Sequence, residues 1–119
     1  MFDFDRSALA SYRGQCHLRL GQAREAAAAF REGLAAVPVG CERRGAFLVI
    51  GLAEASLAAR EKDVALADAL RALAVFQKLG SAAGILRVHR FRGLLAKAGH
   101  RREAGVLDEH VRSYLPDAP

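Results

Sequence analysis

Apolar residues between positions 7 and 38 recur every three or four residues, a spacing that places them on one face of an α-helix. They form two runs, Leu9, Tyr12, Cys16 and Leu20, followed by Ala26, Phe30, Leu34 and Val37. Gly21 separates the runs, and Pro38 follows the second one. The pattern therefore predicts two helices that bury these residues, with a tight turn at Gly21 between them and a stop at Pro38. Asp5 or Ser7 is the expected N-cap of the first helix.

The same periodicity continues through residues 41–80 and predicts a second helical hairpin. Its helices are expected at about 42–60 and 64–79, with Asp63 as the N-cap of the later one. Lys62 takes the place of glycine in the turn between them. This hairpin therefore matches the first one less well.

Residues 81–116 predict a third hairpin, which Gly80 precedes and Ser81 is expected to cap. Five residues of the first hairpin recur 78 positions later: Gly21, Arg24, Glu25, Ala26 and Pro38 return as Gly99, Arg102, Glu103, Ala104 and Pro116. Two units over this distance give a mean period of about 39 residues. The sequence is therefore expected to contain an internal helical repeat.

The first hairpin combines small residues with one aromatic residue and a terminal proline, in the order Gly14, Gly21, Ala26, Phe30, Gly33 and Pro38. This order resembles the tetratricopeptide repeat, although Ala10 stands where that family has Trp or Tyr. The resemblance implies an all-α fold, a short right-handed α-solenoid of three helical hairpins. We expect one domain over residues 1–116, with repeats at about 7–40, 41–80 and 81–116 and a non-helical tail at 117–119.

Composition agrees with one small all-α domain. The chain has 119 residues, enough for a single core, and much of its 52% hydrophobic content is alanine. β-branched residues are few and no strict alternation occurs, which argues against strands. The net charge is +5, and Arg supplies 15 of the 18 basic residues, as expected for GC-rich coding.

The basic excess is concentrated in residues 81–119, which carry seven Lys or Arg against four Asp or Glu. The run comprises Arg87, His89, Arg90, Arg92, Lys97, Arg101 and Arg102. One interpretation is an anionic partner such as a nucleic acid. The interpretation we favour is a solvated face, because no aromatic platform accompanies the charges.

Residues typical of catalysis or metal binding are not arranged for either task. The four His residues show no HxxxH or HExxH spacing, and neither a GxSxG motif nor a glycine-rich phosphate loop occurs. Cys16 and Cys41 form no CxxC motif and are expected to be free thiols in a reducing cytosol. We therefore expect a cytoplasmic protein that is not an enzyme, holds no metal or cofactor, and does not enter a membrane.

A second resemblance covers nearly the whole chain. Gly80-Ser81 is followed by an arginine-rich helix up to Lys97, a turn at His100-Arg101 and the sequence Leu107-Asp108-Glu109. This order is similar to the C-terminal repeat region of XRE-class helix-turn-helix transcriptional regulators of GC-rich bacteria. The resemblance implies the sensing or interaction half of such a regulator. Direct DNA binding is not supported, because the DNA-binding domain of that class has no counterpart here.

These observations predict a protein- or peptide-binding module. In tetratricopeptide repeats the first helix of each pair lines the groove, and the corresponding residues here are Ser11, Gln15, Arg19, Ser56, Arg60, His89 and Lys97. Arg19, Arg60 and Lys97 are expected to form a column of cations that favours an acidic segment or a free carboxylate. The alternatives are a structural fragment that dimerises through the two helices of residues 81–116, and a basic nucleic-acid-associated accessory protein.

Overall fold

Six α-helices follow one another along the chain. The computed structural model describes the backbone of residues 3–114 and the side chains of residues 6–112. The helices are α1 (Asp3–Arg19), α2 (Ala23–Ala35), α3 (Glu42–Ala58), α4 (Lys62–Leu79), α5 (Ala82–Lys97) and α6 (Arg101–Tyr114). No strand occurs in the described chain, so the all-α prediction is confirmed. The predicted tail at 117–119 lies outside the described residues.

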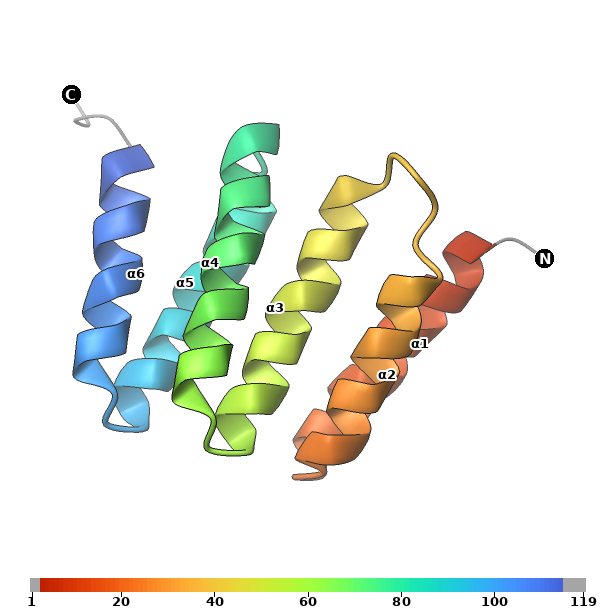
Figure 1. Ribbon diagram of the computed structural model, residues 1–119, viewed down its shortest axis with the longest axis horizontal. Coiled ribbons are helices and arrows are strands. Elements are labelled where there is room, and N and C mark those ends of the chain that lie inside the picture. Colours follow the sequence, from red (N-terminus) through yellow and green to blue (C-terminus); the bar gives the residue numbers. More distant parts are fainter. Residues whose placement is uncertain (1–2, 115–119) are drawn as a thin grey trace.

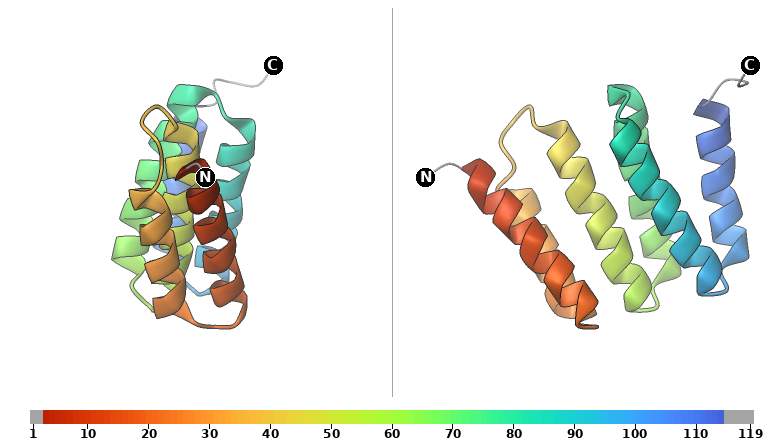
Figure 2. Two further views of the ribbon diagram at one scale, coloured as in Figure 1. Left: turned by 90° about the vertical axis from the view of Figure 1, so that its right-hand side faces the viewer. Right: turned by 180° about the vertical axis from the view of Figure 1, so that it is seen from behind.

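Each helix packs against the next one in sequence, and the helices stand in a row with α1 and α6 at opposite ends (Figure 1). Further contacts join α1 to α3, α3 to α5, and α4 to α6. Seen from behind, α1 and α5 lie nearest the viewer with α3 between them (Figure 2). The molecule measures 46 × 30 × 18 Å. Alternate helices α1, α3 and α5 therefore share one side of the row.

Every connection contains a residue in the left-handed conformation two positions before the next helix begins. Four of them are glycines, and the fifth is Arg60, with φ of 65°. The prediction that Lys62 corresponds to Gly21 is therefore wrong, because α4 already begins at Lys62 and Asp63 lies in its first turn rather than at its N-cap. Gly21, Arg60 and Gly99 are 39 residues apart. The same spacing thus relates the turns of all three helical hairpins.

Burial follows the same 39-residue spacing. Ala26, its counterpart Ala65 and the third member Ala104 are 0%, 0% and 2% exposed. On the first helix of each hairpin, Ala10, Val49 and Val88 are also buried. Ser81 caps α5 as predicted, since its Oγ accepts a hydrogen bond from the backbone N–H of Gly84 at 3.1 Å. The start of the third hairpin was therefore correctly predicted.

The buried face of α1 differs from the prediction. Leu9, Tyr12 and Leu20 are 59%, 69% and 70% exposed, and Cys16 is exposed as well. The residues that α1 turns inward are small ones: Ser7, Ala10 and Gly14. Asp5 and Ser7 lie inside the helix and do not cap it.

Phe30 explains why α1 turns its small residues inward. Its ring is fully buried, and a Cβ atom built on Gly14 would lie 2.5 Å from it. A larger side chain at that place on α1 would overlap the ring. The leucine-bearing face of α1 is therefore excluded from the contact with α2.

No helix among the described residues is long and apolar enough to cross a membrane.

Replacing Arg60 by Gly is expected to raise the free energy of unfolding by about 1 kcal/mol. The left-handed conformation costs a non-glycine residue roughly 1–2 kcal/mol, and the greater freedom of glycine in the unfolded chain offsets part of the gain. Urea denaturation of the wild type and of Arg60→Gly measures the difference. Arg60→Ala serves as the control, because it removes the charge and keeps the strained conformation. A loss of stability in Arg60→Gly would contradict this assignment of the turn.

Candidate functional site

An open groove lies on the side of the row where α1, α3 and α5 meet. Its volume is about 540 Å³. Its lining comes from α1 (Gln15, Leu18, Arg19), from α3 (Glu54, Leu57, Ala58), from α5 (Arg90, Leu94, Lys97) and from Ala98 directly after α5. We call it the α1–α3–α5 groove. Three helices that are not consecutive in sequence build it, because α3 contacts both α1 and α5.

The groove combines an apolar surface with exposed positive charge. Each helix contributes one leucine, Leu18, Leu57 and Leu94, of which Leu94 is 45% exposed. The side chains of Arg19, Arg90 and Lys97 are exposed to solvent. Such a surface can bind an apolar side chain while its cations attract a carboxylate.

The carboxylate in the groove is already paired. The Glu54 side chain is only 7% exposed, and it accepts hydrogen bonds from Arg87 Nη2 at 2.6 Å and Nε at 3.1 Å. This two-point ion pair joins α3 to α5 and neutralises the buried charge. The charge that the groove presents to a ligand therefore comes from its cations.

The structure brings together three of the predicted site residues, Gln15, Arg19 and Lys97. Arg60 instead lies in the turn before α4, so the predicted column of three cations is interrupted. Ser56 is half-buried on α3 and His89 is exposed on α5, and neither lines the groove.

The groove residues predicted on α3 differ from the observed ones for a simple reason. Aligning Lys62 with Gly21 shifted the predicted lining by two residues, whereas the 39-residue spacing pairs Gln15 with Glu54 and Arg19 with Ala58. Sequence reasoning therefore missed Glu54 on α3. It also missed Leu57 on α3 and Arg90 and Leu94 on α5 as lining residues. The sequence did contain a signal for the correct turn residue, because position 60 lies midway between the turn residues Gly21 and Gly99.

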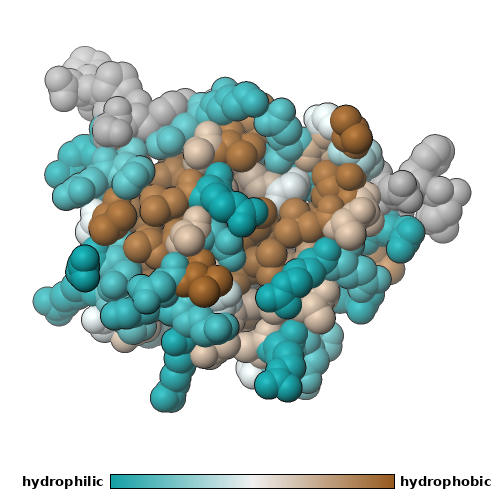
Figure 3. Space-filling view, in the orientation of Figure 1, coloured by the Kyte–Doolittle hydropathy of each residue, from teal (hydrophilic) through white to brown (hydrophobic). Residues whose placement is uncertain are grey.

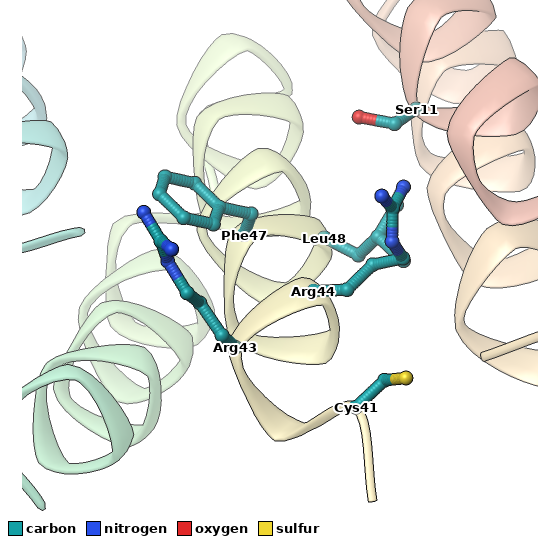
Figure 4. A pocket seen from close by; sticks show the side chains of 6 residues that line it. All are labelled: Ser11, Cys41, Arg43, Arg44, Phe47 and Leu48. Carbon is teal, nitrogen blue, oxygen red and sulfur yellow. The ribbon is translucent and has the colours of Figure 1, made fainter. Parts of the chain in front are cut away.

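A second cavity of about 450 Å³ lies nearby between α1 and α3, and it contains Ser11 (Figure 4). The other lining residues are Cys41, Arg43, Arg44, Phe47 and Leu48. The Arg43 guanidinium lies 5.8 Å from the centroid of the Phe47 ring, and Figure 4 shows Arg44 extending in the direction of Ser11. Ser11 precedes Gln15 by one helical turn. This cavity therefore lies next to the groove along the same junction between α1 and α3.

The opposite side of the molecule carries apolar patches interrupted by polar side chains (Figure 3). A cleft of about 360 Å³ lies there over α3, lined by Leu34 of α2 and Val75 of α4 among others. Close to it, burial raises the pKa of the Asp68 carboxyl, while the charges of Arg71 and Arg31 oppose that shift. Arg71 Nη1 lies 3.2 Å from Asp68 Oδ1.

The basic run of residues 87–102 does not form one continuous charged surface. Arg87 is paired with Glu54, and Arg92 is paired with Asp108 of α6 at 3.0 Å. Arg90 and Lys97 line the groove. Within the part of the chain that the structure describes, no group of His, Cys, Asp or Glu side chains could hold a metal ion.

Comparison of the chain with protein-family models, with curated proteins and with solved structures gives no match.

Replacing Arg87 by Met is expected to lower the free energy of unfolding by about 3 kcal/mol, because it leaves the buried Glu54 carboxylate without its partner. Arg92→Met is the matched control, since the Arg92–Asp108 pair is 37% and 29% exposed and its loss should cost less than about 1 kcal/mol. Urea denaturation of both variants measures the difference. Equal losses would show that the Glu54–Arg87 pair contributes no more to the free energy of unfolding than the more exposed Arg92–Asp108 pair.

Proposed function

We propose that this chain is a protein- or peptide-binding module of the tetratricopeptide-like kind, a short α-solenoid of three hairpins that binds its ligand in the α1–α3–α5 groove. The observation that carries the proposal is an open groove to which the first helix of every hairpin contributes. The 39-residue spacing of turns and buried residues supports the repeat character. One-dimensional stacking of such units generates an extended binding face.

The ligand that fits this groove is an acidic segment with at least one apolar side chain. Burial of leucine surface supplies about 25 cal/mol per Å², so the apolar contact provides most of the affinity. Exposed ion pairs contribute roughly 0–1 kcal/mol each, and their main effects are on specificity and association rate. Arg19 lies 39 residues before Ala58, and Lys97 lies 39 residues after it. The two cations therefore lie on α1 and α5, with α3 between them.

The alternatives have less support. Dimerisation through α5 and α6 requires exposed apolar surface on both helices. On α6, Leu107 is fully buried and Val106 and Val111 are half-buried, so the exposed apolar side chains are those of α5, Leu86 and Leu94. Leu115 lies outside the described residues. Nucleic-acid binding is weakened by the engagement of Arg87 and Arg92 in ion pairs. Membership of a transcriptional regulator remains a hypothesis that rests on the sequence resemblance alone.

Titration of fluorescein-labelled octapeptides of Glu and Leu tests the proposal. We expect the Arg19→Ala/Lys97→Ala variant to bind about fivefold to tenfold more weakly than the wild type, which corresponds to two exposed ion pairs. Raising the salt from about 50 to about 300 mM should weaken wild-type binding, because the Debye length shortens.

The matched control is Arg24→Ala/Arg60→Ala, which removes the same charge outside the groove. It should bind like the wild type. Equal binding by all three proteins, or binding of Gln-for-Glu peptides with undiminished affinity, would contradict the proposed use of the groove.

A further inference from the structure

The cavity of about 450 Å³ between α1 and α3 is not used by the proposed function. We call it the Ser11 cavity. Its lining includes the half-buried ring of Phe47 and the side chain of Leu48, which is 1% exposed (Figure 4). The Phe47 ring packs against the buried ring of Phe76, with 4.8 Å between the two centroids. The Ser11 cavity is therefore large enough to hold an aromatic side chain of a ligand, and its wall offers a firmly packed ring for that side chain to contact.

Charge does not define the ligand at the Ser11 cavity. Arg43 and Arg44 of α3 line it, but α1 carries Asp3 and Asp5 in its first turn, so groups of both signs occur at this end of the junction. The Arg43 guanidinium lies 5.8 Å from the centroid of the Phe47 ring, where it can also contact the face of a bound aromatic ring. The preference expected of the cavity is therefore for an aromatic side chain.

The α1–α3–α5 groove, in contrast, has a charge of one sign to offer. Its exposed cations are Arg19, Arg90 and Lys97, and none of them takes part in the ion pairs between the described side chains. The carboxylate among its lining residues, that of Glu54, is held by Arg87. The groove therefore favours a leucine of the ligand with acidic residues beside it.

The distance between the cavity and the groove sets the spacing of these two ligand residues. Phe47 in the cavity and Leu57 in the groove are ten residues apart on α3, which is about 15 Å along the helix axis. An extended chain advances about 3.3–3.6 Å per residue, so its residues i and i+4 are about 13–14 Å apart. They also point to the same side, because side chains alternate along an extended segment. A spacing of four residues therefore matches the two sites.

We infer that the α1–α3–α5 groove and the Ser11 cavity together bind one extended segment of a partner protein, in which an aromatic residue and a leucine are four positions apart and carboxylates lie beside the leucine. The aromatic side chain enters the cavity against Phe47, and the leucine with its carboxylates occupies the groove near Lys97. The inference rests on the proposed function, because it takes the groove as the peptide-binding surface. It adds a second anchor and the spacing that a partner must have.

Fluorescence anisotropy with matched, labelled heptapeptides tests the spacing. The probe FSSSLEE has Phe and Leu four positions apart, SSFSLEE has the same composition with a spacing of two, and SSSSLEE lacks the aromatic residue. We expect FSSSLEE to bind the full chain at least about tenfold more tightly than the other two. FSPSLEE, in which proline opposes a helix, should bind like FSSSLEE. Every peptide is also measured in reversed order, and the direction that binds more tightly is used.

Variants of the full chain locate the second anchor. Ser11→Leu fills the cavity from α1 and should abolish the difference in affinity between FSSSLEE and SSSSLEE. Cys16→Leu is the matched control, because it adds a leucine at an exposed position of the same helix that lines neither the cavity nor the groove. It should retain the difference. Arg19→Ala/Lys97→Ala should weaken both peptides by the same factor, and circular dichroism checks that each variant is folded.

Three results would overturn the inference while the proposed function stands. The first is equal binding of FSSSLEE, SSFSLEE and SSSSLEE by a chain that binds the octapeptides of Glu and Leu. The second is a higher affinity for FSSSLEE that Ser11→Leu leaves intact. The third is loss of binding in FSPSLEE alone, which would assign the site to a helical segment. Failure of all these peptides and of the octapeptides at concentrations up to about 1 mM would contradict the proposed function and the inference together.

Discussion

The packing of the Phe30 ring between two glycines is the constraint on which the N-terminal half of the structure depends. A Cβ atom on Gly14 of α1 or on Gly51 of α3 would lie 2.5 or 2.6 Å from this ring. One side chain of α2 therefore fixes the approach of both neighbouring helices. Phe76 of α4 has a similar relation to Gly84 of α5. The tight contacts between these helices rest on aromatic rings placed against glycine backbone.

The place that Phe30 occupies is filled differently in each hairpin. Gly14 and Phe30 correspond, at the 39-residue spacing, to two buried alanines in the second hairpin, Ala53 and Ala69. In the third hairpin they correspond to Arg92 and Asp108, which form an ion pair. Corresponding positions of successive hairpins thus hold an aromatic ring against a glycine, two alanines of one buried cluster, and a salt bridge. The helical arrangement is retained while the side-chain chemistry changes.

Much of the fold could be predicted from the sequence because helical periodicity and glycine turns are local signals. All six helices, the turns at Gly21 and Gly99 and the Ser81 cap were predicted. The buried face of α1 was predicted wrongly, because hydrophobicity selects Leu9 and Tyr12 whereas contact with Phe30 requires small residues. Local patterns do not reveal that requirement, which comes from another helix.

The groove could be predicted only in part for a related reason. Three predicted residues line it, but Arg60 occupies a left-handed position that sequence rules reserve for glycine. Treating Lys62 as the turn residue moved the expected lining of α3 away from Glu54. The burial of Glu54 depends on its pairing with Arg87, 33 residues later in the chain, and no local pattern indicates that contact.

The stability of Gly51→Ala tests the central constraint most directly. Alanine normally stabilises a helix interior relative to glycine by about 0.5–1 kcal/mol, and Gly45→Ala on the same helix, where a Cβ atom meets open space, should show this gain. Gly51→Ala should instead lose about 1–3 kcal/mol, because its methyl group overlaps the Phe30 ring, and the loss should shrink in the Phe30→Leu background. A gain in Gly51→Ala equal to that of Gly45→Ala would contradict the account.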